Sequence, residues 1–385
     1  AGTMAAAAAT TAPATIAAAP TTTAAATTTA AVVPPKPKPK PRPKPVHVGL
    51  PSDRTRLKLL RTIGGDISPK SVVSSGTGWI TAQNMMYRHT VTVYDARTLR
   101  LVKTIPDGVE LARFGVHGHP GTSQGAPVEA DFAPGGAKAY VTNYSMYGAN
   151  FGPEGSDTCS PDSGYDRSYL YRIDVARWRI DDVYRVGSVP KVVKVTPDGR
   201  YALVTNWCSW DLSVVSLRLG RVVRTIPIGA YPRGIVVAPN GRAAYVAIMG
   251  DTHLMRVDLR TWRTRTIEIG AGPRALAFAP NGRWIYATLN NEGRVVRLDL
   301  RTGDVVGVGT GSAPRSLAMS SDGKALYVVN YESGTISKIR TRDMQVVQEI
   351  DACEHPIGIA YDAPTARVWA ACYGGALLVF RDRRR

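Results

Sequence analysis

The sequence predicts an all-β protein, a seven-bladed β-propeller built from four-stranded antiparallel blades. Three landmarks recur together: a proline that opens an apolar strand, a Pro-Asn-Gly or Ser-Asp-Gly turn, and a Tyr-Val strand that ends before a polar loop. Five of these prolines are spaced 42, 41, 41 and 42 residues apart, at Pro190, Pro232, Pro273, Pro314 and Pro356. A fixed period of about 40 residues with four short strands per repeat is typical of propellers.

The repeat that begins at Pro273 shows how each strand is predicted. Residues 274–279 form the first strand, and the following Asn-Gly makes a hairpin turn in which glycine can take a positive φ. Residues 284–289, 294–298 and 304–308 are the second, third and fourth strands. Because these strands are dense in Val, Ile and Leu, both of their faces need cover, which neighbouring blades supply.

Two earlier prolines, Pro69 and Pro127, open further repeats and bring the predicted blades to seven. The interval from Pro127 to Pro190 is 63 residues, so we expect an extra loop of about 21 residues inside the second blade. The last repeat lacks a fourth strand, and residues 57–64 resemble the fourth strand at 222–229. We therefore expect the N-terminal strand to pair with the last blade and close the ring, which removes an open sheet edge.

The second strands carry a recurring motif. Tyr-Val-Thr-Asn stands at 140–143 and is echoed at 203–206, 245–248 and 327–330. With the Pro-Arg-Gly and Pro-Asp-Gly elements, this pattern resembles the YVTN-repeat (YncE-like) family of seven-bladed propellers over roughly residues 57–380. The resemblance implies the fold and says little about activity, since related propellers include lactonases, quinoprotein dehydrogenases and non-catalytic surface proteins.

The chain divides into three parts by composition. Residues 1–33 are nearly all Ala, Thr and Pro without a charge, which predicts a disordered stalk and no transmembrane segment. Residues 34–56 begin with PPKPKPKPRPKP, an extended polyproline-II linker. This linker is either a stiff spacer or an electrostatic tether to anionic wall polymer, membrane or nucleic acid. Residues 57–385 form the propeller.

The four cysteines predict two disulfides. No His or Cys cluster has the spacing of a zinc site. The blade geometry places Cys353 and Cys372 on one rim, and it places Cys159 of the blade-two insertion near Cys208. Pairing Cys159 with Cys208 and Cys353 with Cys372 implies an extracytoplasmic compartment. The alternative is four separate reduced thiols.

Catalytic and cofactor signatures are weak. Residues 121–125 match G-x-S-x-G, but they lie in an inter-blade loop instead of a strand-to-helix elbow. Four histidines fall in loops of one propeller face, namely His89, His117, His119 and His355. They could hold a transition metal if they converged, and otherwise they are solvated loop residues. No other cofactor is predicted.

The residue after the blade-opening proline is a cation in five of the seven blades. These cations are Lys70, Lys191, Arg233, Arg274 and Arg315. Like charges around one opening are costly, so either neighbouring acids such as Glu129 or Asp131 neutralise them, or an anionic ligand binds there. Aromatic residues on the same face would suit a stacked base or sugar ring. They are Tyr144, Trp207, Trp210, Tyr331 and Tyr373.

Together these features favour a secreted or surface-tethered, monomeric, non-catalytic binding or scaffold module. We expect its partner at the loop-rich face to be an anionic small molecule or polymer, or a cell-envelope protein, with nucleic acid less favoured. The alternative is a propeller enzyme, a lactonase-like hydrolase or a lyase that uses the same face and is metal-dependent or not. Its candidate carboxylates are Glu129, Asp251, Glu292 and Glu332.

Overall fold

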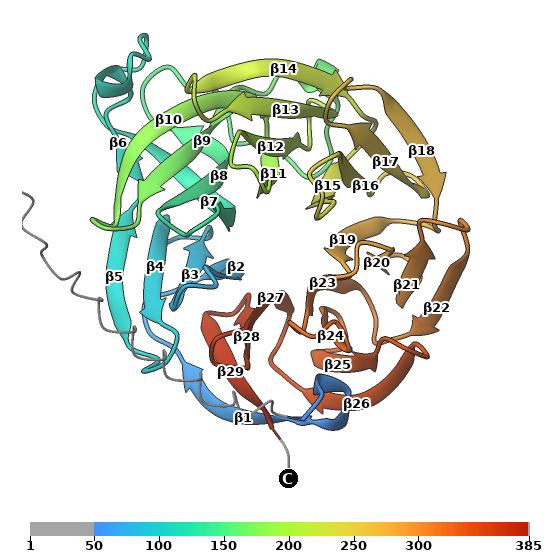
Figure 1. The fold of residues 1–385 in the computed structure, drawn as a ribbon. Helices are drawn as coiled ribbons and strands as arrows, with labels where there is room; N and C mark the ends of the chain where they lie inside the picture. Colours follow the sequence, from blue (N-terminus) through green and yellow to red (C-terminus); the bar gives the residue numbers. More distant parts are fainter. Residues whose placement is uncertain (1–49, 384–385) are drawn as a thin grey trace, which may run out of the picture. The chain divides into compact units, whose positions relative to one another are not determined.

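The computed structural model describes residues 50–383, which form a ring of seven antiparallel β-sheets (Figure 1). Blade one consists of β2 (Pro69–Ser74), β3 (Trp79–Asn84), β4 (Thr90–Asp95) and β5 (Leu101–Pro106). Blade two consists of β7 (Ser123–Phe132), β8 (Lys138–Tyr147), β9 (Arg167–Asp174) and β10 (Arg179–Ser188). Blade three consists of β11 (Pro190–Val195), β12 (Tyr201–Asn206), β13 (Asp211–Ser216) and β14 (Arg221–Pro227). Blade four consists of β15 (Pro232–Val237), β16 (Ala243–Ile248), β17 (His253–Asp258) and β18 (Thr264–Glu268).

The remaining blades repeat the plan. Blade five consists of β19 (Pro273–Phe278), β20 (Trp284–Leu289), β21 (Arg294–Asp299) and β22 (Val305–Gly309). Blade six consists of β23 (Pro314–Met319), β24 (Ala325–Asn330), β25 (Thr335–Arg340) and β26 (Gln345–Asp351). Blade seven consists of β27 (Pro356–Asp362), β28 (Arg367–Cys372), β29 (Ala376–Arg383) and β1 (Arg56–Ile63). The first strand of each blade lines the axis of the ring, so the predicted fold class is confirmed (Figure 1).

The N-terminal strand closes the ring as predicted. β1 pairs antiparallel with β29, with Leu57 opposite Asp382 and Ile63 opposite Leu377. Contacts begin earlier than the predicted boundary at residue 57, because Ser52 in the 3-10 helix η1 (Ser52–Arg54) bonds to Asp322 of blade six. The predicted stalk 1–33 and all of the predicted linker before residue 50 lie outside the described residues. No helix in the described part of the chain is long and apolar enough to cross a membrane.

Blade two departs from the regular plan in two places. Pro127 does not open its inner strand, because β7 already begins at Ser123 and pairs with β8 from Gln124 onwards. The predicted insertion follows β8 and contains the 3-10 helix η3 (Pro161–Ser163). A second insertion precedes β7, with the short strand β6 (Gly108–Val109) and the 3-10 helix η2 (Leu111–Phe114). β6 pairs antiparallel with β7, so the sheet of blade two has a fifth strand. The repeat pattern did not predict this segment, although Pro69 and Pro127 are 58 residues apart.

Apolar side chains fill the spaces between blades, and the Thr-Asn pair of the motif links the blades. Thr142 Oγ1 donates to the carbonyl of Lys191 at 3.1 Å, and Thr205 Oγ1 donates to the carbonyl of Arg233 at 2.9 Å. Each bond joins a second strand to the first strand of the next blade. Asn206 Oδ1 accepts a hydrogen bond from the backbone N–H of Gly187, near the end of β10, at 3.1 Å. The motif therefore holds the starts of β11 and β15 in place.

Candidate functional site

The five predicted cations meet around the axis. Each is the second residue of its inner strand, and the inner strands enclose a central cavity of about 350 Å³. Lys70, Arg233, Arg274 and Arg315 line this cavity, and Lys191 is adjacent on β11 with a side chain only 3% exposed. We call these five residues the mouth cations. Blades two and seven carry Val128 and Ile357 at the equivalent position.

A repeated backbone contact places an aromatic ring beside these cations. The residue before the blade-opening proline has a left-handed backbone, with φ of 53° at Val189 and 52° at Ala313. Its carbonyl accepts a hydrogen bond from the residue that follows the second strand. Trp207 N donates to Val189 O at 2.9 Å, and Tyr331 N donates to Ala313 O at 3.0 Å. An aromatic residue directly after the second strand therefore lies next to the start of an inner strand.

Four of the five mouth cations lie against aromatic rings. The distances from nitrogen or guanidinium carbon to ring centroid are 3.6 Å for Arg315–Tyr331, 5.0 Å for Lys70–Tyr373, 4.2 Å for Lys191–Tyr144, 5.0 Å for Lys191–Trp207 and 5.9 Å for Arg233–Trp207. Such contacts are worth about 0.5–2 kcal/mol each and orient the cation without neutralising it. The fifth predicted rim aromatic, Trp210, packs edge-on against Tyr231 instead.

Within the described residues, one mouth cation alone has a carboxylate partner. Lys191 Nζ lies 2.7 Å from Asp157 Oδ1. Asp131, one of the two acids considered as neutralising partners, instead bonds to Lys194 Nζ at 2.8 Å. The mouth cations without an ion pair among the described residues are Lys70, Arg233, Arg274 and Arg315. Arg315 Nε is also buried without a hydrogen-bond partner there.

Burial and mutual repulsion disfavour the charged forms of Lys70, Lys191, Arg233 and Arg274. Burial, opposed by Asp157 and reinforced by Arg233, lowers the pKa of Lys191 to about 7. Burial likewise lowers the pKa of Arg233 to about 10, and it lowers those of Lys70 and Arg274 with help from neighbouring cations. An anion bound at the mouth would relieve this repulsion.

Glu129 is an acidic residue that lines the same cavity as these cations. Burial raises its pKa to about 7, although Ser71 and the charge of Arg233 oppose the shift. Thr142 Oγ1 lies 3.3 Å from the carbonyl of Glu129 and 3.1 Å from that of Lys191, so the two backbones are adjacent. A carboxyl group and an amine that both titrate near neutral pH therefore belong to neighbouring strands of one channel.

The histidines do not come together. His355 stacks on Tyr331 at 4.4 Å, and His119 stacks on a phenylalanine ring at 3.9 Å. His89 Nδ1 lies 2.6 Å from a backbone carbonyl, and His117 is exposed. The described residues contain no group of three or more His, Cys, Asp or Glu residues that could hold a metal ion. The predicted histidine cluster is therefore not found there.

The candidate carboxylates are also dispersed. Of the four, Glu129 lines the channel cavity and the other three have partners in separate loops. The distances are 3.4 Å for Asp251–His253, 3.4 Å for Glu292–Arg294 and 4.0 Å for Glu332–His355.

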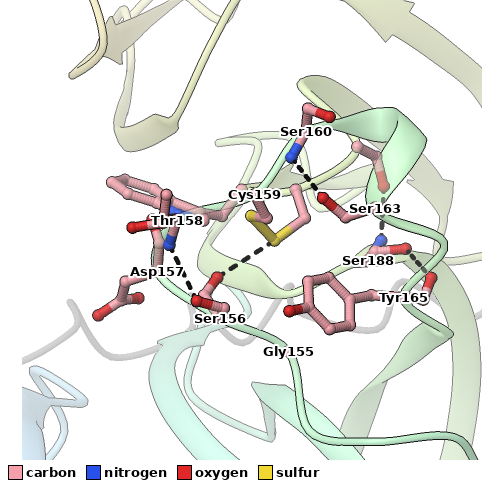
Figure 2. The surroundings of a disulfide bond; sticks show 12 residues. Gly155, Ser156, Asp157, Thr158, Cys159, Ser160, Ser163, Tyr165 and Ser188 are labelled. Carbon is pink, nitrogen blue, oxygen red and sulfur yellow. Dashed lines mark hydrogen bonds between the residues drawn. A yellow bond between two sulfur atoms is a disulfide. The ribbon is translucent and has the colours of Figure 1, made fainter.

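Both predicted disulfides are present. Cys159 is bonded to Cys208, and Cys353 is bonded to Cys372. Figure 2 shows the first of these beside Asp157 and Thr158, in the insertion that follows β8. Trp207 Nε1 donates to the carbonyl of Asp157 at 3.0 Å and adds a second attachment of this insertion to blade three.

Comparisons with known proteins agree with the architecture. A model of the family described as Cytochrome D1 heme domain matches residues 269–374, less than a third of the chain. A solved structure described as Kuenenia stuttgartiensis hydrazine synthase matches with a TM-score of 0.65 at 17% identity. That match covers 83% of this chain and 97% of the other. These likenesses show the propeller fold. A search of curated proteins found no match.

The matching family is not the YVTN-repeat family that the motif resembles, so the finer assignment stays a prediction. Sequence reasoning found the mouth cations and the aromatics separately and missed their pairing. The available signal was the aromatic residue directly after the second strand in three blades, at Trp207, Tyr331 and Tyr373, and directly after the motif asparagine within β8, at Tyr144. It also missed Asp157, which no repeat position predicts because it lies in an insertion.

Proposed function

We propose that this propeller is a non-catalytic binding module that takes an anionic ligand at the channel mouth. One observation carries the proposal: four of the five mouth cations have no carboxylate partner among the described residues. Five cations converging on one opening concentrate anions there and pull them towards the axis. Arg side chains bind carboxylate and phosphate in a bidentate manner, so either group suits this site.

The aromatic rings narrow the ligand class. Tyr331 and Tyr373 lie beside Arg315 and Lys70, and they contact each other edge-on with centroids 6.4 Å apart. A ligand that carries both an anionic group and an apolar or ring portion would use both features. We therefore propose a carboxylated or phosphorylated small molecule, or the anionic repeat of a polymer.

Because a heme domain family matches part of the chain, we compare the residues of the channel with the groups of a heme. The carboxylates of a heme would suit the mouth cations. A heme iron, however, takes axial ligands such as His, Cys, Met or Tyr. The cavity lining contains no His or Cys. Its Met319 lies at the end of β23, whereas Arg315 lies at the start of that strand, and its Tyr361 lies near the end of β27.

At the mouth, Tyr331 and Tyr373 contact Arg315 and Lys70, and His355 stacks on Tyr331. The mouth therefore fits the anionic groups of such a ligand better than its iron, and we derive no step through iron.

We further propose that the protein works outside the cytoplasm, as a secreted or surface-tethered monomer. The two disulfides support this location, because such bonds persist in oxidising compartments and are rare in the cytosol. Peptide mapping of protein from its native source without reductant would test it. Free thiols at Cys159 and Cys208 would contradict it.

A thermal-shift screen tests the binding proposal. Phosphate, pyrophosphate, citrate and their neutral analogues would be compared on the parent protein and on Arg233→Gln. A ligand at 100 times its Kd adds about 2.7 kcal/mol to the free energy of unfolding, so the melting temperature should rise for the anions alone. Arg233→Gln should shrink the rise, whereas Arg242→Gln, an exposed arginine with no contact to the mouth cations, should not.

An enzyme that uses the same channel is the second candidate. Glu129 and Lys191 favour it, because both have pKa values of about 7 and lie on adjacent inner strands, as an acid–base pair would. Its chemistry would be hydrolysis of a lactone or elimination from an anionic substrate. A panel of lactones and carboxylated substrates tests it: turnover by the parent protein that is lost in Glu129→Gln would favour the enzyme over the binding module.

A further inference from the structure

One of the mouth cations is already paired with an anionic side chain of this protein, the carboxylate of Asp157. Asp157 lies in the insertion after β8, and no other blade has an equivalent segment. Its Oδ1 atom is 2.7 Å from Lys191 Nζ and accepts a weaker hydrogen bond from Tyr144 OH at 3.4 Å. The carboxylate therefore occupies the position at Lys191 that an anionic ligand would occupy.

The side chain of Asp157 is accessible even though its partner is not. Its exposed fraction is 76%, against 3% for the Lys191 side chain. A solvent-facing carboxylate on a buried amine can leave when another anion arrives, and the amine then remains paired. Exchange does not strand a buried charge, because the released carboxylate returns to water and the incoming anion pairs with the amine.

The backbone of Asp157 is held even when its carboxylate leaves. Cys159, two residues later, is bonded to Cys208, and the carbonyl of Asp157 accepts the bond from Trp207 Nε1 at 3.0 Å. Trp207 and Cys208 directly follow β12, so both attachments come from the corner of blade three where that strand ends. A tether this short keeps the local concentration of the carboxylate high.

We propose that Asp157 is a tethered competitor that occupies the Lys191 position until an anionic ligand displaces it, and that the Cys159–Cys208 disulfide holds it there. This rests on the proposed function, since it assumes an anion site at the mouth. The insertion thus sets how tightly the propeller binds its ligand. Reduction of this one disulfide releases the competitor and strengthens binding.

Calorimetric titration of pyrophosphate into Asp157→Asn and the parent protein tests the competitor. Removing an exposed competing charge should tighten binding about three- to tenfold. Asp162→Asn is the matched control, because it removes one charge from the same insertion and Asp162 makes no ion pair there. Equal affinity of the parent protein and Asp157→Asn, or weaker binding by the variant, would overturn the inference and leave the anion site standing. If neither protein binds pyrophosphate, both the anion site and the competitor are overturned.

A double-mutant cycle tests the role of the disulfide. The pair Cys159→Ser/Cys208→Ser should tighten pyrophosphate binding in the parent protein and have no further effect when Asp157→Asn is already present. The pair Cys353→Ser/Cys372→Ser removes the other disulfide and should leave affinity unchanged in both backgrounds. Melting curves would confirm that each variant is folded. Equal effects of the first pair with and without Asp157 would contradict the tether.

Discussion

A buried ion pair at the ring closure gives the sharpest stability prediction. Lys338 of blade six is fully buried, and its Nζ donates to Asp382 Oδ1 at 2.6 Å. The same amine donates to the carbonyl and the Oγ1 of Thr55 at 2.9 and 2.8 Å, just before β1. Tyr327 OH donates to the other oxygen of Asp382. One amine and one carboxylate thus connect blade six to both outer strands of blade seven.

Replacing Lys338 with methionine keeps most of the volume and leaves the Asp382 carboxylate buried and unpaired. Breaking a buried pair in this way costs about 3–5 kcal/mol of unfolding free energy. Lys338→Met/Asp382→Asn removes the stranded charge, and the asparagine still accepts from Tyr327. We expect the double variant to lose only about 1–3 kcal/mol, which is the scale of the lost neutral hydrogen bonds.

Denaturant unfolding followed by tryptophan fluorescence would measure both variants. We expect the second substitution to restore at least 1 kcal/mol of unfolding free energy, because it removes the Asp382 charge that Lys338→Met leaves buried and unpaired. A double variant no more stable than Lys338→Met would refute the reasoning and mean that the pair does not close the ring as described. The exposed pair of Arg113 and Glu110 is the control, since its removal should change stability by less than about 1 kcal/mol.

Three further predictions concern the closing strand, the two disulfides and the pH dependence of anion binding. A chain that starts at Gly49 should unfold like the full chain, whereas a chain that starts after Ile63 should melt at a lower temperature, because it lacks β1 and the buried Leu57. Reduction should lower the free energy of unfolding by about 2–4 kcal/mol for each disulfide on the loop-entropy scale, and chemical unfolding with and without reductant would measure it. Anion affinity should fall as pH rises from about 6 to about 8, because Lys191 loses its proton and Glu129 becomes charged, both with pKa values of about 7. Binding near pH 7 should then take up protons, which calorimetry in buffers of different ionisation enthalpy would detect.

The pKa of Lys191 also has a consequence for stability. Its folded value of about 7 lies below the ordinary value of 10.5, so the folded state binds fewer protons than the unfolded state between these two values. The burial of Lys191 therefore lowers the free energy of unfolding most below about pH 7. This destabilisation disappears as the pH rises towards 10.5. Lys191→Met should flatten this part of the stability–pH curve.

The sequence contained enough information for the fold and for the order of the blades. The 41- and 42-residue spacing of the prolines reflects a real backbone contact, in which the residue before each proline accepts from the end of the second strand. The closing strand is only partly buried. Leu57 is buried, but Leu59 and Leu60 are 51% and 37% exposed, because an outermost strand has one face without a neighbouring blade.

The candidate site was predictable only where it repeats. The mouth cations occupy one position of the repeat, so their convergence on the axis follows from the ring. Asp157 lies outside the repeat, and its contact with Lys191 depends on how an irregular insertion folds back over blade three. Glu129 directly follows Val128, which stands at the cation position of its blade, and it lines the same cavity as the mouth cations.

The anion site itself is tested most directly by calorimetric titration of pyrophosphate into the parent protein and Arg233→Gln/Arg315→Gln at two salt concentrations. We expect the parent protein to bind pyrophosphate and added salt to weaken this binding, because the attraction is between charges. The double variant should bind at least tenfold more weakly with a smaller salt dependence. Its melting temperature without ligand should be equal to or higher than that of the parent, since two mutually repelling charges are gone. A parent protein that binds no anion, together with a double variant that melts lower, would contradict the account and make these arginines structural.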